Sequence, residues 1–479
     1  RKGMLATIVP TSETGYAAVQ IQQYIQNAVE TWDPAPEFVL IGGDSGSVPV
    51  PTENWALTDC PYGNVDGDQF IELHVGRFPA SSLTQIELMV EKTLIYERTP
   101  TTDESYYRSA ALLIAEDYDD DDWLHYFGDA QWEAALMTSS EYEQVDILSV
   151  ATTPNQTDVF ESLLLEGLSF SGFHGQIGGT VGWSGFNVVP DQLDNGPMLP
   201  VLVSYTCSTL GTPSAGGEQW MKAGSPGNPR GGVAFVGQTV SCSYCAHWRS
   251  ALRRGFYGHI FLDTGENDRC TMGEAVETAR LNYYDEFHQM EQYLASTLYG
   301  DPELNLWTKV PADVAIDHPP TVARGEIEFS VTATEDGGCR EGIQIAITSD
   351  EGVFAVETTG EDGQVTFTVD SSADEILYIT ATGRNVRPYE AEIEVGGDAA
   401  QTGDDDDITG DDDDTTAPPD DDVTDDGDDD DDIVNEPLDT EGSTSLDSDC
   451  SCSSTGPRPA IPAALTAILA LLFLRRRIS

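Results

Sequence analysis

Two stretches decide the fold: residues 168–175 read LSFSGFHG, and residues 200–208 read PVLVSYTCS. Each is a short apolar run that ends on a reactive side chain, His174 in the first and Cys207 in the second. Such runs are typical of strands buried on both faces of a parallel sheet, and the carboxyl ends of neighbouring parallel strands share one edge. A thiol and an imidazole delivered to that edge can form a nucleophile and its base.

The flanking sequence predicts the same α/β architecture. Residues 38–41 (FVLI), 110–115 and 232–236 have the pattern of buried strands. They alternate with predicted helices at 17–31, 128–139 and about 272–298. We therefore expect a parallel sheet covered by helices, in two subdomains at residues 1–105 and 106–311. Residues 1–9 already have a turn-and-strand pattern without a signal peptide, so we expect the natural start to lie upstream.

The remaining sequence changes texture twice. Residues 318–397 contain short alternating strands separated by Gly/Asp turns, which predicts a small immunoglobulin-like β-sandwich. Residues 398–449 include all eighteen aspartates of a cluster between Gly403 and Asp432 and predict a disordered tether. Residues 450–479 combine two cysteines, an apolar run from about 460 to 474 and Arg475–Arg477. We interpret them as a short hydrophobic helix in a sorting and anchoring tail, with a single membrane-spanning anchor as the alternative.

Charge and cysteine content limit the function classes. The formal net charge of −62 over 479 residues argues against nucleic acid as a partner and favours an extracellular or cation-rich setting. Eight cysteines are too few for a disulfide scaffold. The cysteines neither prove nor exclude an oxidising compartment, and it is from the C-terminal tail that we expect an exported protein whose globular part faces outward.

Two further motifs could bind metal. Asp59, Asp66 and Asp68 alternate with glycines and have the oxygen density of a calcium site, although a plain aspartate turn explains them equally well. The run CSYCAH at 242–247 offers soft ligands for zinc, but a local disulfide or two free thiols is favoured because no second ligand pair lies nearby.

Taken together, several motifs resemble the gingipain family of cysteine peptidases, which have a caspase-like fold. The resemblance covers roughly residues 1–311. Its motifs are EFVLIGGD (37–44), DGD (66–68) with VGRFP (75–79), His174-Gly175 with Gly182-Trp183, the strand into Cys207, GVAFVG (232–237) and YGDPEL (299–304).

The resemblance implies a role for each site residue. Cys207 would be the nucleophile and His174 the catalytic base and acid, while the backbone N–H groups of Gly175 and Cys207 would hold the oxyanion. Glu116 is the best match for a carboxylate that supports the histidine. Two positions depart from the family pattern: Thr206 precedes the nucleophile, and the glycine that follows it comes only at Gly211. Both departures affect the side of the site that faces the substrate.

The substrate pocket is the least defined part of the resemblance. Asp122 is the candidate for an acid that selects basic side chains, and Trp183 and Trp248 are candidates for its walls. The alternative is that the acidic run 119–122 is a solvated loop or a calcium site.

The resulting hypothesis is a secreted, surface-anchored cysteine endopeptidase acting on protein or peptide substrates. It needs no cofactor for catalysis, with calcium as a structural option. Its other partners would be the C-terminal sorting machinery and, through the tail, a membrane. The alternative is a catalytically silent surface module that uses the peptidase-like fold and the sandwich for binding.

Overall fold

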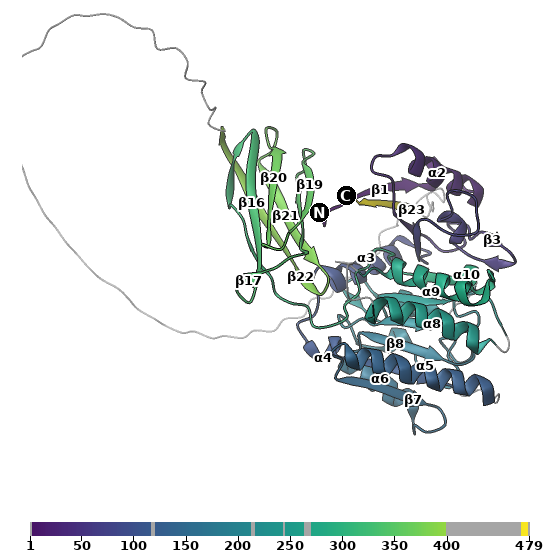
Figure 1. The fold of residues 1–479 in the computed structure, drawn as a ribbon. Helices are drawn as coiled ribbons and strands as arrows, with labels where there is room; N and C mark the ends of the chain where they lie inside the picture. Colours follow the sequence, from purple (N-terminus) through teal and green to yellow (C-terminus); the bar gives the residue numbers. More distant parts are fainter. Residues whose placement is uncertain are drawn as a thin grey trace, which may run out of the picture. The chain divides into compact units, whose positions relative to one another are not determined.

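Figure 1 shows the chain in a computed structural model that describes residues 2–115, 120–211, 216–242, 245–262, 270–398 and 471–477. Within these residues the main sheet has ten strands in the order β1-β23-β2-β5-β13-β12-β9-β8-β6-β7. Neighbours are parallel from β2 to β13 and from β12 to β7, β12 and β13 are antiparallel, and β23 is antiparallel to both neighbours. The predicted α/β fold is confirmed. The strands are β1 (Met4–Pro10), β2 (Phe38–Gly42), β5 (His74–Phe78), β6 (Ser109–Ile114), β7 (Gln144–Ser149), β8 (Phe170–His174), β9 (Val201–Ser204), β12 (Ala234–Gln238), β13 (Ser296–Tyr299) and β23 (Leu471–Arg477).

Helices cover both faces of this sheet. Side chains of α5, α8 and α9 pack in one core with Val201 and Val203, and side chains of α3, α6 and α7 pack in a second core with Leu202. Alternate residues of one strand therefore enter opposite cores, as expected for a strand buried on both faces. The helices are α1 (Thr11–Thr14), α2 (Ala18–Thr31), α3 (Leu83–Glu97), α4 (Glu104–Tyr107), α5 (Asp120–Ser139), α6 (Gln156–Glu166), α7 (Gly216–Lys222), α8 (Ala246–Phe261), α9 (Met272–Phe287) and α10 (Glu291–Ala295). Short elements complete this part: β3 (Thr52–Glu53), β4 (Ala56–Leu57), β10 (Gly224–Ser225), β11 (Asn228–Pro229) and the 3₁₀ turns Cys60–Tyr62 and Pro190–Gln192.

Two motifs of the family resemblance meet where β5 lies beside β13. A Cβ atom on Gly76 would lie 2.4 Å from the carbonyl oxygen of Gly300 and 2.8 Å from Pro302, so only glycine fits there. The neighbouring Arg77 is buried and donates 2.6 Å to the carbonyl of Gly43, which belongs to the GGD motif. These motifs hold neighbouring strands of the sheet together.

One long predicted helix is wrong in its C-terminal part. The segment expected to be helical to residue 298 contains α9, which ends at Phe287, then α10 and the strand β13. His288 has a φ of 53°, a left-handed conformation that ends α9. The strand forms because residues 296–299 fill a place between β5 and β12.

The C-terminal prediction also needs correction. Residues 471–477, expected in a hydrophobic helix and the following arginine cluster, form the strand β23 between β1 and β2. An apolar segment in this position satisfies the main-chain hydrogen bonds of two strand edges at once, which a helix cannot do. The strands β1 and β23 lie side by side in Figure 1, with Met4 paired to Arg477. The Asp-rich segment 399–449 and the rest of the tail lie outside the described residues.

Residues 315–398 form a β-sandwich of two sheets, one of β14, β16, β17 and β20 and one of β15, β22, β21, β18 and β19. Its core contains side chains of both sheets, such as Val331 and Phe367 from the first and Ile347 and Ile379 from the second. No helix in the described ranges is long and apolar enough to span a membrane. The strands are β14 (Ala315–Asp317), β15 (Thr321–Arg324), β16 (Glu326–Glu335), β17 (Gly338–Cys339), β18 (Gln344–Thr348), β19 (Phe354–Thr358), β20 (Gln364–Asp370), β21 (Ile376–Gly383) and β22 (Val386–Asp398).

Candidate active site

The histidine lies at the carboxyl end of β8, as its strand pattern predicts. His174 is 2% exposed, and its ring nitrogen Nε2 lies 3.1 Å from the carboxylate of Glu133 on α5. The same nitrogen lies 2.8 Å from Nη2 of Arg253 on α8. Among the described residues the other ring nitrogen, Nδ1, has no hydrogen-bond partner. One side of the imidazole is therefore fixed by the protein, and the other side can accept or donate a proton.

A buried ion pair supports this histidine. The guanidinium of Arg253 donates 2.6 Å and 2.9 Å to the two carboxylate oxygens of Glu133. Arg253 also donates to the carbonyl of Phe173, and it crosses β8 at Gly172, where a Cβ atom would lie 2.6 Å from Nη2. We call Glu133, His174 and Arg253 the histidine network.

Burial and charge shift the pKa values of the network in a consistent way. Burial and then the Arg253 charge lower the pKa of His174, and they outweigh the Glu133 carboxylate, which acts in the opposite direction. Burial alone would raise the pKa of Glu133, but the charges of Arg253 and His174 lower it below its usual value. The resting network is therefore a neutral imidazole beside a carboxylate paired with a guanidinium.

The cysteine follows the neighbouring strand, β9, which is parallel to β8 with Gly172 opposite Val203. Cys207 is 9% exposed, and its Sγ lies 3.2 Å from the carbonyl of Cys242 and 3.5 Å from the N–H of that residue. Thr206 donates 3.1 Å through its hydroxyl to the carbonyl of Gly175. The threonine that departs from the family pattern thus joins the cysteine loop to the histidine loop.

A second arginine of α8 contacts both loops. Arg249 donates 2.8 Å from Nη2 to Sγ of Cys207, and its Nη1 lies 3.5 Å from the carbonyl of Gly175. The structure therefore brings the cysteine loop and the histidine loop to one guanidinium at the same edge of the sheet.

The predicted oxyanion groups lie in this place as well. Gly175 has a φ of 154°, and a Cβ atom there would lie 2.8 Å from Ala115, so the position requires glycine. Neither the N–H of Gly175 nor that of Cys207 donates a hydrogen bond to another described residue. Both donors remain available for a ligand.

The other predicted site residues have different outcomes. Glu116 lies outside the described residues, and the carboxylate that the structure brings to His174 is Glu133. Asp122 is 8% exposed in the first turn of α5, and its charge acts on the thiol of Cys242. Trp248 is half-buried against Tyr283 and Phe287.

The prediction that Trp183 lines the substrate pocket is wrong. Its side chain is fully buried, stacks on Phe173 with ring centroids 5.3 Å apart, and donates to the hydroxyl of Ser204. A large apolar ring with a satisfied N–H is more stable in the core than in an open cleft.

The CSYCAH motif lies beside the nucleophile. Cys242 and Cys245 are free thiols, and a hydrogen bond between their side chains, with the charge of Arg249, lowers the pKa of Cys242. The same hydrogen bond, with burial, raises the pKa of Cys245. In the residues that the structure describes, no group of metal-binding side chains includes these cysteines.

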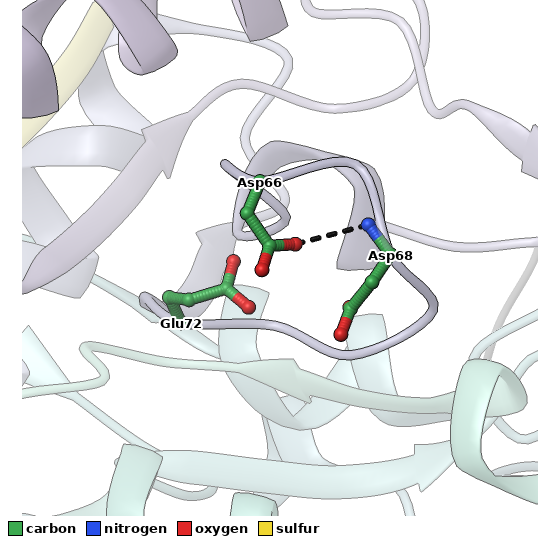
Figure 2. Close-up of side chains that lie close together, drawn as sticks. All are labelled: Asp66, Asp68 and Glu72. Carbon is green, nitrogen blue, oxygen red and sulfur yellow. Dashed lines mark hydrogen bonds between the residues drawn. The ribbon is translucent and has the colours of Figure 1, made fainter.

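The calcium prediction needs one correction. Asp59 is buried and accepts from Arg77 with both carboxylate oxygens, at 2.8 Å and 2.6 Å, and it does not belong to the group of possible metal ligands among the described residues. Figure 2 shows that Asp66 and Asp68 lie instead with Glu72. Potential ligand atoms of the three side chains lie within 4.8 Å of one another. All three side chains are exposed, and each accepts a backbone N–H of its own loop. We call Asp66, Asp68 and Glu72 the acidic loop. Its oxygens fit part of a calcium shell.

Sequence reasoning missed Glu133, Arg249 and Arg253. A signal was present, because each lies on the buried face of its helix: Glu133 follows Ala130 by three residues on α5, and Arg253 precedes Phe256 by three on α8. Charged residues at apolar helix positions indicate a buried polar network, but the sequence does not say which strand end they face.

Comparisons with known proteins agree with this geometry. Residues 4–307 match peptidase family C25. Gingipain R2 of Porphyromonas gingivalis is 26% identical over 395 residues, covering 79% of this chain and 52% of the relative. Lys-gingipain W83 of the same organism is 35% identical over 88 residues, covering 18% of this chain and 5% of the relative. The chain thus spans about half the length of the first of these relatives.

Solved structures match the fold. The crystal structure of the Arg specific cysteine proteinase gingipain R superposes with a TM-score of 0.70 and 20% identity, covering 79% of this chain and 88% of that one. A complex of pro- and mature domains from Porphyromonas gingivalis gives the same TM-score and identity, with 90% of that chain covered. The caspase-like arrangement expected for the α/β part is that of these structures.

Proposed function

The chain belongs to peptidase family C25, and on that premise we propose that it is a cysteine endopeptidase with Cys207 as nucleophile and His174 as base and acid. The observation that carries the proposal is the meeting of the two strand-end loops. Thr206 and Arg249 both bind the carbonyl of Gly175, next to His174, and Arg249 also binds Sγ of Cys207.

The proposed reaction has two halves, formation of a thioester and its hydrolysis, and Cys207 and His174 act in both. Sγ of Cys207 attacks the carbonyl carbon of the scissile peptide bond, a C–S bond forms, and the thiol proton passes to Nδ1 of His174. The oxyanion accepts hydrogen bonds from the backbone N–H groups of Gly175 and Cys207. The C–N bond then breaks, and the departing amine takes the proton from His174.

Water completes the cycle. It attacks the thioester while His174 accepts its proton, and the C–S bond breaks to release the acid and restore the thiol. Glu133 would hold Nε2–H of the ring in both halves, so that Nδ1 stays the working nitrogen and the imidazolium is stabilised when it forms.

For the substrate, we propose a preference for basic residues before the scissile bond, with Asp122 as the selecting acid. The support is the burial of Asp122 near Cys242, whose carbonyl contacts the nucleophile. A structural relative is described as Arg specific. An Asp122→Asn variant should lose rate on arginine and lysine peptides and keep its rate on neutral ones.

We also propose export and display at a cell surface through the C-terminal tail and its sorting machinery. The support is the Asp-rich segment and the apolar run followed by Arg475–Arg477. Since residues 471–477 lie in the main sheet, anchoring through them requires their release from β1 and β2. Cell fractionation with antibodies against the sandwich and against residues 471–479 tests whether both epitopes reach the surface together.

The activity is tested with fluorogenic peptides that end in arginine, lysine or aspartate before the reporter. We expect the full chain to cleave at least one basic peptide, and Cys207→Ala to reduce the rate by about 10⁴-fold or more. Arg254→Met, an exposed change on α8, serves as the matched control. Cleavage that survives in Cys207→Ala would falsify the proposal.

The alternative function, a silent binding module, predicts a different result. A folded full chain would cleave none of the peptides, and iodoacetamide would label Cys207 no faster than the exposed Cys339. Fast and selective labelling of Cys207 contradicts that alternative.

A further inference from the structure

Arg249 is a buried cation that lacks a carboxylate partner. Its side chain is 5% exposed, and no carboxylate lies within ion-pair distance of it among the described residues. Its Nε is buried without an acceptor in the same part of the chain. A buried charge is costly unless an opposite charge or hydrogen bonds compensate it, so the groups that do face this guanidinium are informative.

Those groups are two carbonyls, one hydroxyl and one sulfur. The carbonyls of Gly175 and Cys242 and the hydroxyl of Tyr126 lie at 3.2–3.5 Å, whereas Sγ of Cys207 is nearest, at 2.8 Å. The carbonyls cannot ionise, and an ordinary tyrosine stays neutral well above the pH at which a thiol ionises. The sulfur of Cys207 is thus the contact that can supply a negative charge most easily.

Other titratable groups surround this contact on each neighbouring element. The thiols of Cys242 and Cys245 lie on the preceding loop, and the charges of Asp122 and Glu291 act on Cys242. Arg253, one helical turn along α8, is already paired with Glu133. The two arginines therefore differ: one has its counter-ion, and the other faces the thiol.

The histidine network strengthens this difference. A thiolate is usually stabilised by a neighbouring imidazolium. Here burial and Arg253 lower the pKa of His174, so the imidazole is neutral at rest. A second positive charge at the sulfur would therefore stabilise the negative charge that forms there when the thiol gives its proton to His174.

From these contacts we infer that Arg249 is a catalytic residue that stabilises the thiolate of Cys207, an inference that rests on the proposed peptidase function. The guanidinium and the N–H of Cys242 donate to the sulfur as its proton passes to Nδ1 of His174, which then holds that proton for the departing amine. The same donors stabilise the thiolate when the thioester breaks. A single face of α8 then serves both reactive groups, Arg249 for the sulfur and Arg253 for the histidine.

Alkylation of the full chain with iodoacetamide tests the inference without relying on peptide cleavage. The thiolate attacks the carbon of the reagent, a C–S bond forms and iodide leaves, so the rate follows the thiolate fraction. Mass spectrometry of the Cys207 peptide gives this rate across a pH series. Arg249→Met removes the charge and keeps much of the bulk, Arg249→Lys restores the charge, and Arg254→Met is the matched control on the exposed face.

We expect Arg249→Met to slow alkylation at least about tenfold near pH 6, because the rate follows the thiolate fraction and the variant lacks the positive charge beside the sulfur. The rates should converge at about pH 10, where an ordinary thiol is ionised without help. Arg249→Lys should recover most of the loss, and Arg254→Met should match wild type. Circular dichroism melting checks folding, and Arg249→Gln replaces any methionine variant that fails to fold.

The pH profile of alkylation and the peptide assay together decide between the role of Arg249 and the proposed peptidase function. An unchanged pH profile in Arg249→Met, or an equal loss of rate at every pH, overturns the inference. If wild type cleaves peptides and the profile is unchanged, the inference fails while the proposed function stands. A shifted profile in a chain that cleaves no peptide supports the charge assignment and contradicts the peptidase function.

Discussion

The histidine network and the acidic loop contain the same chemical group in opposite surroundings. Glu133 is fully buried and pairs with Arg253 and His174, whereas Asp66, Asp68 and Glu72 are exposed on a turn. Water screens the charges of the loop, but it cannot reach Glu133, whose charge depends entirely on its partners. The comparison predicts that the free energy of unfolding lost on removing a carboxylate depends on whether a buried partner is left without its counter-ion, not on the number of charges nearby.

The largest effect should come from removing the buried carboxylate. We expect Glu133→Ala to destabilise the fold by about 3–5 kcal/mol, because Arg253 would remain buried without its counter-ion. Glu133→Gln should cost less, since it keeps an acceptor for the guanidinium. Urea unfolding measures both.

The matched change in the loop is Asp68→Ala, which removes an exposed carboxylate and should cost less than about 1 kcal/mol. Equal losses in the free energy of unfolding for Asp68→Ala and Glu133→Ala would contradict the proposed difference between the buried and the exposed carboxylates.

A smaller effect should appear in the pH dependence of stability. The pKa of His174 is lowered from 6.5, so below about that pH the unfolded chain binds a proton that the folded chain refuses. The pKa of Glu133 is lowered from 4.5, which adds a second loss below that pH. Stability should therefore fall as the pH falls, by at most about 1.4 kcal/mol per pH unit for each proton.

Urea unfolding at a series of pH values measures this slope. His174→Gln should flatten its upper part and leave the part below pH 4.5, the ordinary value for Glu133, in place. A wild-type stability that stays constant as the pH falls from about 6.5 to 4.5 would contradict the neutral, buried histidine.

The smallest effect concerns calcium at the acidic loop. A weak site of the kind found in extracellular modules, with a Kd of about 10⁻⁴–10⁻³ M, would add roughly 1 kcal/mol at millimolar calcium. Thermal melting should therefore move upward with calcium but not with magnesium, and the double variant Asp66→Asn, Glu72→Gln should not respond. An equal calcium response in the double variant would place the ion elsewhere.

The strands that deliver the two reactive residues could be predicted because their signal is local. The run before His174 and the run before Cys207 are buried on both faces, and parallel pairing of β8 with β9 follows from that pattern. The family resemblance then supplied the pairing of thiol and imidazole as a hypothesis, and the structure brings the two strand-end loops together.

The residues that support His174 could not be predicted in the same way. Glu133 and Arg253 come from helices far apart in the sequence, and their meeting depends on how α5 and α8 pack on the sheet. Trp183 was misplaced for a related reason, because an aromatic residue near a catalytic histidine in sequence can equally turn into the core. Residues 471–477 were misplaced because an apolar run also suits a strand when two sheet edges are open to it.

The pairing of β23 with β1 and β2 has a practical consequence. Its main-chain bonds join the last described residues to the first across the whole length of the polypeptide. A protease cut anywhere between residues 399 and 470 would leave the small C-terminal fragment attached without a covalent link. The two pieces should migrate together on a native gel and separate in detergent, and a synthetic peptide of residues 467–479 should reassemble with a truncated chain.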